Sequence, residues 1–313
     1  ITIIIGTPGK SIIDNMKILI LGAPGMLGLS FVKLFSADRN IDLYCSTTSK
    51  KKKLFLKKKF LLKSNKILVF QIKMPNIYKI IKLINNMKFD IIINCIGVIK
   101  PHINEENNKS VINALVINSL FPQELSKISN NKLKIYQIAT DCVFNGSSKL
   151  YDENSNHDAI DIYGKSKSLG ESKRSYFYNL RCSIIGLERY NNLSLVEWFL
   201  SQKSKANLKG FTNHYWNGVS TDVFAELVKT IIFKKIKIPN NLNIIPKNIV
   251  SKYDLLILMK KKFKKSDLLI SKFKSPVTIN RTLKTNFKKI NNSIWKNSKF
   301  KKILSIQEIV EYI

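Results

Sequence analysis

Short apolar runs alternate with longer amphipathic stretches through residues 17–185 of the chain. Runs rich in isoleucine, leucine and valine are typical of strands buried in a parallel sheet, and the amphipathic stretches between them are typical of helices that cover such a sheet. This alternation predicts an α/β fold with a doubly wound parallel sheet. The predicted strands are residues 17–21, 41–45, 67–71, 90–97, 133–139 and 179–185.

The pattern becomes mixed after residue 187, which indicates a second, smaller α/β lobe. We therefore expect one domain at residues 16–186 and a C-terminal lobe at residues 187–313, with some interleaving. Residues 1–15 carry an apolar run that is too short for a signal peptide, and we expect them to be a dispensable extension outside the fold. The predicted helices are residues 25–36, 76–87, 107–129, 193–202, 222–233 and 252–263, and one that contains Tyr163 and Lys167.

Glycines spaced three and three follow the first predicted strand, at Gly22, Gly25 and Gly28. Such glycines allow a tight turn, so that a pyrophosphate can approach the free N–H groups at the start of the next helix. Met26 and Leu27 begin that helix and belong to the same candidate cofactor site. A glycine-rich loop alone is weak evidence, and its place after a buried strand strengthens it.

Tyr163 and Lys167 lie four residues apart, which places both side chains on one face of a helix. An ammonium within hydrogen-bonding range stabilises a phenolate and lowers the pKa of the phenol from its usual value of about 10. Tyr163 would then be a usable acid–base group. Taken alone, the pair is more often part of an exposed helix. Thr140 follows the predicted strand at residues 133–139, at the sheet edge where doubly wound folds bind ligands.

The order of glycine loop, Thr140, Tyr163 and Lys167 resembles the extended short-chain dehydrogenase/reductase superfamily. Within it, the segments at residues 140–146, 151–153, 161–167 and 180–186 resemble the dTDP-4-dehydrorhamnose reductase branch. The resemblance implies an NAD(P)-binding Rossmann domain followed by a substrate lobe. It also implies that a hydride from NADPH reduces the C4 keto group of a nucleotide-activated 4-keto-6-deoxy sugar for surface polysaccharide. Tyr163 would give the proton, Thr140 would polarise the carbonyl, and Lys167 would lower the Tyr163 pKa and hold the nicotinamide ribose.

The cofactor preference is predicted from the end of the second strand. An NAD-specific site has an acidic residue there, whereas this chain has hydroxyls and cations at Ser46, Thr47 and Lys50. This favours NADPH, with NADH still possible. The resemblance also assigns the nicotinamide side of the site to Asn94, Cys95, Ile96 and Gly97.

Substrate contacts are predicted near Thr140 and in the second lobe. Trp216 is either a stacking surface for the sugar nucleotide or core of the lobe, and Arg281 is a candidate partner for a diphosphate. Asn118 matches a structural asparagine of the superfamily or is a plain surface residue. The candidate substrate contacts are Lys100, Asp141, Cys142, Val143, Trp216 and Arg281.

Several alternatives remain open. Dehydratases of the superfamily carry an acidic pair after the threonine, whereas Cys142 follows Asp141 here, which argues against dehydration but does not exclude epimerisation. The reductase branch more often has an aromatic residue in place of Cys142, so the sugar could differ. A related subunit regulates methionine adenosyltransferase without catalysis, and the intact trio Thr140, Tyr163 and Lys167 argues against that role.

The chain of 313 residues has a formal net charge of +32, which raises nucleic acid or an anionic membrane as partners. The charge is nearly all lysine and comes with many isoleucines and asparagines, a composition that reads as coding bias, and no nucleic-acid-binding motif accompanies it. Residues 50–66 could form a basic membrane-surface helix, but a solvated connector is favoured.

The cysteines Cys45, Cys95, Cys142 and Cys182 form no C-x-x-C pair, and the histidines are isolated, so no metal site is predicted. No run of 18 apolar residues exists that could span a membrane. We expect a cytoplasmic protein that binds a nucleotide sugar and no specific nucleic acid. The oligomeric state stays open, with a homodimer among the options.

Overall fold

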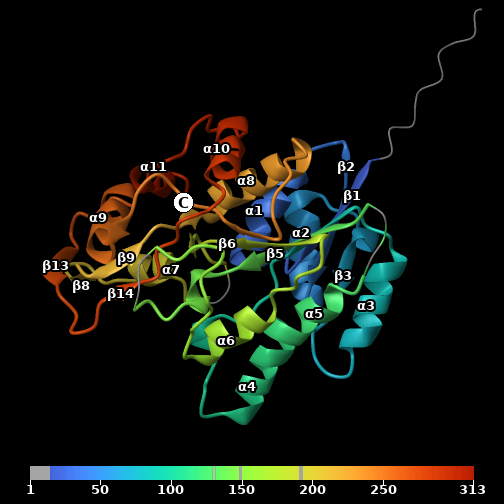
Figure 1. Cartoon of the computed structure of the whole chain (residues 1–313), viewed down its shortest axis with the longest axis horizontal. Helices are drawn as coiled ribbons and strands as arrows, with labels where there is room; N and C mark the ends of the chain where they lie inside the picture. Colours follow the sequence, from blue (N-terminus) through green and yellow to red (C-terminus); the bar gives the residue numbers. More distant parts are fainter. Residues whose placement is uncertain (1–14, 129, 131, 148–149, 190–192) are drawn as a thin grey trace, which may run out of the picture.

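The computed structural model describes residues 15–128, 130, 132–147, 150–189 and 193–313. The expected extension at residues 1–15 therefore lies, except for Asn15, outside the described residues. The centre of the fold is a seven-stranded sheet in the order β11-β6-β5-β4-β1-β2-β3 (Figure 1). All of its strand pairs are parallel. This confirms the doubly wound parallel sheet.

The apolar runs form the strands because they are buried on both faces. Within β1, the residues from Ile18 to Leu21 are completely buried, and Ile91 to Ile93 of β4 are nearly so. The strand order reverses between β1 and β4, which creates a crevice at their carboxyl ends. The bounds are β1 Met16–Leu21, β2 Ile41–Thr47, β3 Ile67–Val69, β4 Ile91–Asn94, β5 Lys134–Ala139, β6 Phe177–Arg181 and β11 Asn241–Asn243.

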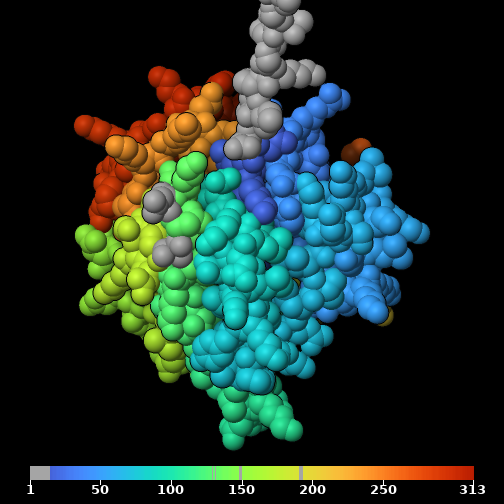
Figure 2. All heavy atoms as spheres, turned by 90° about the vertical axis from the view of Figure 1, so that its right-hand side faces the viewer, coloured from blue at the N-terminus to red at the C-terminus, as the bar shows by residue number. Residues whose placement is uncertain are grey.

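Helices cover both faces of the sheet. Helices α1, α2, α8 and α10 contribute to the hydrophobic core on one face, and α3 and α5 contribute to the core on the other. Figure 2 looks onto the side of the molecule that the N-terminal half covers, with the C-terminal segments along one edge. The bounds are α1 Met26–Phe35, α2 Lys50–Phe60, α3 Ile77–Asn86, α4 Asn108–Leu115, α5 Phe121–Leu125, α6 Ile162–Leu169, α8 Thr221–Phe233 and α10 Lys288–Asn297.

The second lobe has its own core and lies at the β11 end of the sheet (Figure 1). The division at residue 186 stays a prediction, because β11 and α8 from the second half complete the first domain, which is the interleaving that we expected. The lobe elements are β7 Ile184–Ile185, α7 Leu195–Leu200, β8 Asn207–Phe211, β9 His214–Trp216, β10 Val219–Ser220, β12 Val250–Ser251, α9 Lys252–Lys262, β13 Leu269–Phe273, β14 Ile279–Asn280 and α11 Ile306–Val310.

Two predicted elements are divided in the structure. The strand expected at residues 179–185 ends at Arg181, and Ile184–Ile185 forms β7, which pairs with β10 outside the main sheet. The helix expected at residues 107–129 contains a π-helical turn, Val116–Leu120, between α4 and α5. A π-turn inserts an extra residue and turns a side chain toward a new direction, and here it buries Asn118.

The lysine-rich segment forms α2, in which Leu56 is completely buried and Leu54 is half exposed. Leu61, directly after the helix, is 88% exposed. The helix packs on the core through Leu56, with Phe55 and Phe60 partly buried against it, and the choice between a connector and a membrane-surface helix stays open. None of the helices in the described part of the chain is long and apolar enough to cross a membrane.

Candidate active site

The glycine loop closes tightly at the carboxyl end of β1. Gly22 has a φ of +75°, a conformation that favours glycine, and the N–H of Gly25 donates to the Gly22 carbonyl oxygen at 3.0 Å. A Cβ on Gly28 would lie 2.3 Å from that same oxygen. The start of α1 therefore needs glycine at both positions. No side chain caps this helix start, so its N–H groups can donate hydrogen bonds to an anionic ligand.

Ser46, which was predicted to bind the cofactor, instead stabilises the glycine loop through two hydrogen bonds. Its Oγ accepts from the Gly22 N–H at 3.0 Å, and its carbonyl oxygen accepts from Ala23 at 3.1 Å. Ser46 is only 1% exposed and Thr47 is also buried, so neither hydroxyl faces a cofactor phosphate. Lys50, the first residue of α2, is exposed. Of the three residues predicted to bind a 2′-phosphate, only Lys50 is exposed, and its role stays a prediction.

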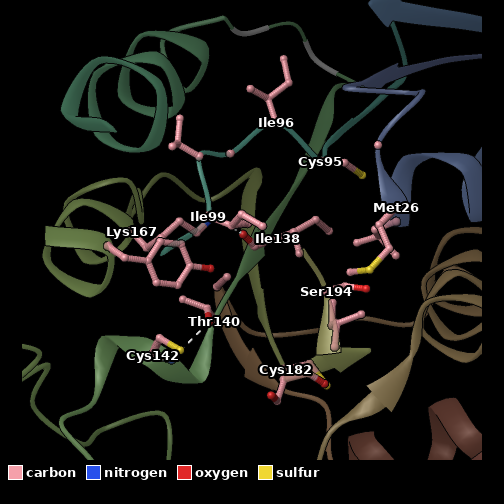
Figure 3. Close-up of a pocket in the computed structure, with 18 of the residues that line it drawn as sticks. Met26, Cys95, Ile96, Ile99, Ile138, Thr140, Cys142, Lys167, Cys182 and Ser194 are labelled. Atoms are coloured by element: carbon pink, nitrogen blue, oxygen red, sulfur yellow. Dashed lines mark hydrogen bonds between the residues drawn. The ribbon is translucent and has the colours of Figure 1, made fainter. Parts of the chain in front are cut away.

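A cavity of about 410 Å³ lies at the carboxyl ends of β1, β4 and β5. Figure 3 shows Met26 and Ser194 on one side of it, with Thr140, Cys142 and Lys167 across from them. Of the predicted residues, the cavity is lined by Gly25, Met26, Leu27, Cys95, Ile96, Gly97, Thr140, Asp141, Cys142, Tyr163 and Lys167. Within the described residues, no group of histidine, cysteine, aspartate and glutamate side chains is placed to hold a metal ion.

The three candidate catalytic side chains converge on this cavity from β5 and α6. Thr140 follows β5 directly, and its Oγ1 accepts from the Cys142 N–H at 3.1 Å. The same hydroxyl lies 3.3 Å from Oδ1 of Asp141, to which it can donate. Lys167 is buried, and its Nζ donates to the carbonyl oxygen of Ile138 at 2.7 Å. The threonine hydroxyl, the phenol and the ammonium therefore share one enclosed space.

Burial sets the proton affinities of these groups. It lowers the pKa of the Lys167 ammonium to about 8, with the Glu171 carboxylate acting in the opposite direction. Burial also raises the pKa of the Tyr163 phenol above its usual value, and a hydrogen bond with Thr140 opposes this only in part. The net shift of the Tyr163 pKa is therefore upward, opposite to the depression expected from Lys167, because desolvation of the phenolate is the largest cause. A phenol that stays protonated at neutral pH is suited to donate a proton.

Contacts at the start of α6 hold Tyr163 in place. Oδ1 of Asp161 caps the helix by accepting from the Gly164 N–H at 2.7 Å, and Oε1 of Glu105 accepts from the Ile162 N–H at 2.9 Å. The Lys100 ammonium lies 2.7 Å from Oδ2 of Asp161, in an ion pair that leaves Lys100 largely exposed. Lys100 therefore does not line the cavity as predicted. Instead, it pairs with Asp161, the residue that caps α6, and α6 carries Tyr163.

Asn118 links this helix to the segment after β4. Its Oδ1 accepts from the Val98 N–H at 2.8 Å, and its Nδ2 donates to the Val98 carbonyl oxygen at 2.9 Å and to the Ser166 hydroxyl at 3.1 Å. Its interpretation as a structural asparagine is confirmed, and the surface alternative is wrong.

Asn94 and Val143 also differ from their predicted roles. Asn94 is completely buried, where its Nδ2 donates to Gln137 and its Oδ1 accepts from the Ile96 N–H. It shapes the turn that presents Cys95 to Gly97 and does not line the cavity. Val143 is also completely buried and packs with Phe144 in a small core cluster.

The two substrate contacts predicted in the second lobe belong to its framework. Trp216 is 3% exposed, packs in the lobe core and donates its indole N–H to Ser183 Oγ at 2.9 Å. Arg281 Nε donates to the Phe144 carbonyl oxygen at 2.7 Å and so holds the segment that follows Thr140. Burial raises the pKa of the Asp141 carboxyl, and the cations Lys252 and Arg281 oppose this rise. Arg281 thus influences the cavity through its charge.

The sequence did not point to a second group of lining residues, which comes from the chain between β6 and α7. Oε2 of Glu188 accepts from the N–H groups of Leu193 and Ser194 at 2.8 and 2.9 Å. A serine and a glutamate three residues apart, Ser194 and Glu197, do signal a helix start there. No pattern reveals that the segment folds back over the cavity. These additional lining residues include Cys182, Ser183, Ile184, Glu188 and Ser194, and His102 from the segment after β4 also lines the cavity.

Comparison with known proteins adds two kinds of finding. The sequence profile of the family described as RmlD substrate binding domain matches residues 16–304. A comparison with curated proteins found no match. Among solved structures, the chain is similar to a dTDP-4-dehydrorhamnose reductase from Clostridium acetobutylicum, with 20% identity, a TM-score of 0.72, and coverage of 95% of this chain and 98% of that one.

Two further solved structures contain a nicotinamide cofactor. The dTDP-4-dehydrorhamnose reductase from Bacillus anthracis, in complex with NADP, is 17% identical with a TM-score of 0.71, and the match covers 95% of this chain and 98% of that one. The UDP-glucuronic acid 4-epimerase from Bacillus cereus, in complex with NAD, is 17% identical with a TM-score of 0.69, and the match covers 95% and 94%.

At these identities, similarity to solved structures shows the fold, and the profile match over most of the chain shows the family. The tight glycine loop, the cavity at the reversal of strand order and the trio on β5 and α6 agree with both findings. The chain therefore belongs to the RmlD substrate binding domain family, a branch of the extended short-chain dehydrogenases/reductases, and has the fold of dTDP-4-dehydrorhamnose reductases.

Proposed function

We propose that this protein is an NADPH-dependent reductase of the C4 keto group of a nucleotide-activated 4-keto-6-deoxy sugar, acting in surface polysaccharide synthesis. The observation that carries the proposal is the placement of Thr140, Tyr163 and Lys167 around one cavity beside the uncapped start of α1. The family membership and the names of the similar solved reductases support the same reaction class.

The described residues fit a nicotinamide cofactor. The N–H groups at the start of α1, near Met26 and Leu27, would bind its diphosphate, and the segment from Cys95 to Gly97 would border its nicotinamide half. The cofactor supplies a hydride when bound. Gly97 lies beside Asn118 and Lys167, since a Cβ there would be 3.4 Å from Asn118 Oδ1 and 4.0 Å from Lys167 Nζ.

The chain's own residues would handle the substrate oxygen. Thr140 Oγ1 would turn from Asp141 to the carbonyl oxygen and polarise it. The Tyr163 phenol would donate its proton to the oxygen as negative charge develops there. The Lys167 ammonium, held by the Ile138 carbonyl, would bind the ribose hydroxyls and stabilise the phenolate that proton donation leaves.

Epimerisation is the second candidate, because a 4-epimerase with bound NAD shares the fold and nothing in the cavity excludes it. A panel of 4-keto sugar nucleotides, with NADPH oxidation followed at 340 nm, tests the proposal. We expect stoichiometric oxidation with at least one member. Interconversion of 4-hydroxy sugar nucleotides without net NADPH oxidation would instead identify an epimerase. NADPH binding without either reaction, together with a partner enzyme that depends on this chain, would favour a regulatory subunit.

We expect NADPH to bind more tightly than NADH, because the end of β2 carries no carboxylate and Lys50 is exposed beside it. Replacing Lys50 with alanine should weaken NADPH by roughly tenfold and leave NADH unchanged, the scale of one charge-assisted contact. Dissociation constants at physiological salt measure both effects. Lys57→Ala, an exposed lysine in the last turn of the same helix, is the control and should change neither. Equal or tighter NADH binding by the parent would contradict the cofactor assignment.

A further inference from the structure

A completely enclosed arginine lies directly behind the catalytic helix. Arg181 ends β6, beside Ala139 of β5, and is only 1% exposed. Its Nη2 donates to Oε2 of Glu171 at 2.6 Å and to Nε2 of His157 at 2.9 Å, and its Nη1 donates to Oδ1 of Asn243 at 3.1 Å. One guanidinium therefore joins the end of α6, the loop after β5, and β11.

The protonation of His157 follows from this geometry. A guanidinium can only donate, so Nε2 of His157 must accept and the ring proton must lie on Nδ1. That proton is directed to Ser168 Oγ, 2.7 Å away on α6. Burial lowers the pKa of His157, which agrees with a neutral ring. Glu171 is thus the carboxylate that compensates the Arg181 charge in this network.

Glu171 follows Lys167 by four residues, the spacing at which side chains on one face of a helix meet. The N–H of Glu171 donates to the Ser168 carbonyl oxygen at 3.2 Å, so the chain is still turning where α6 ends. Gly170 packs against the π-turn so closely that a Cβ there would lie 2.0 Å from the Asn118 carbonyl oxygen. The spacing between Glu171 and Lys167 is therefore fixed by packing.

Arg181 satisfies only part of the Glu171 carboxylate. Oε1 of Glu171 is buried and accepts no hydrogen bond from the described residues. A buried carboxylate that is not fully paired favours a cation nearby. Consistent with this, Glu171 acts on Lys167 to favour its charged form, against the burial that disfavours it.

We propose that Glu171 is a positioning residue which, held by Arg181, keeps Lys167 as an ammonium ion at the cavity wall. The inference rests on the role proposed above for Lys167. Charged or titratable groups from several elements lie around Lys167 and Glu171. Cys95, which follows β4, and Tyr163 on α6 line the cavity, while Arg181 and His157 lie beside Oε2 of Glu171. Of these groups, Glu171 is the carboxylate, and it follows Lys167 by four residues.

Removing the Glu171 charge lowers the Lys167 pKa, so that the ammonium is lost at a lower pH. Cofactor affinity that depends on this ammonium should then begin to fall at a lower pH. We expect Glu171→Gln to move the alkaline decline of cofactor binding down by about one pH unit, the usual scale for one nearby opposite charge.

The experiment measures the dissociation constant of NADPH, or of NADH if the parent binds it more tightly, between pH 6 and 10. Glu124→Gln is the matched control, because Glu124 is also a nearly buried carboxylate in an ion pair, with Lys127, and lies on α5 outside the cavity. The double variant Glu171→Gln with Arg181→Met removes both buried charges together and should shift the decline in the same direction by a smaller amount if the single variant does not fold.

Three results would each overturn the inference. The alkaline decline in cofactor affinity could stay unchanged in both Glu171 variants, or Glu124→Gln could shift it equally. The parent could also show no alkaline decline in affinity at all. The measurement needs no sugar substrate. If the shift appears while no 4-keto sugar is reduced, the positioning role stands and the proposed reaction fails. If a sugar is reduced and the decline does not move, only the positioning role fails.

Discussion

Replacing Tyr163 with phenylalanine is expected to lower turnover by roughly 10²-fold or more, the usual contribution of a general acid. The change removes only the phenolic oxygen, and the aromatic ring continues to line the cavity beside Thr140 and Cys142. Folding and cofactor binding should therefore survive. The loss should appear in kcat and kcat/KM alike, because the proton is transferred in the transition state. The rate of NADPH oxidation with the best sugar of the panel is the measurement.

Tyr136→Phe is the control for this variant. Tyr136 is a buried tyrosine of β5 that stacks on Tyr178 with ring centroids 5.4 Å apart, and it does not line the cavity. Its replacement should leave turnover close to that of the parent. A Tyr163→Phe enzyme as fast as the parent would remove the phenol from the mechanism.

Replacing Lys167 with alanine should reduce both turnover and cofactor affinity. The ammonium is proposed to stabilise the phenolate and to bind the ribose, so turnover should fall by roughly 10²-fold and the NADPH dissociation constant should rise by about tenfold or more. Kinetics and fluorescence titration measure the two effects separately.

Lys165→Ala is the matched control, since Lys165 is an exposed lysine on the same helix. It should change neither quantity. A Lys167→Ala protein that binds NADPH as tightly as the parent would show that this ammonium does not bind the cofactor, whatever its effect on turnover.

The apolar runs determined the sheet because their burial needs no particular partner. Ile18 to Leu21 and Ile91 to Ile93 have no polar side chain to solvate, so the sequence alone places them inside a parallel sheet. The sequence alone also predicts the glycine loop from the spacing of Gly22, Gly25 and Gly28. Glycine is needed at the last of these positions because a Cβ on Gly28 would clash with atoms of the loop itself. The order of Thr140, Tyr163 and Lys167 along predicted elements was also sufficient to bring them to one cavity.

Strand β11 was missed because its burial depends on distant partners. Asn241 and Asn243 are polar, and they lie in the sheet only because Asn179, Arg181 and the carbonyl oxygen of Lys284 bond to their side chains. No local pattern contains this information. The divided helix at residues 107–129 has a similar cause, since the π-turn presents Asn118 to Val98 and Ser166, which are distant in the sequence.

The tertiary structure also decided which polar side chains serve the fold rather than the cavity. Ser46 supports the glycine loop, Lys100 pairs with Asp161, Trp216 bonds to Ser183, and Arg281 holds the Phe144 carbonyl. A side chain's residue type states what it can donate or accept, and only the three-dimensional neighbours decide whether that capacity is left for a ligand. The sequence alone therefore determined the sheet, the glycine loop and the trio, whereas long-range hydrogen bonds decided the remaining polar roles because a buried polar group must be paired wherever the fold places it.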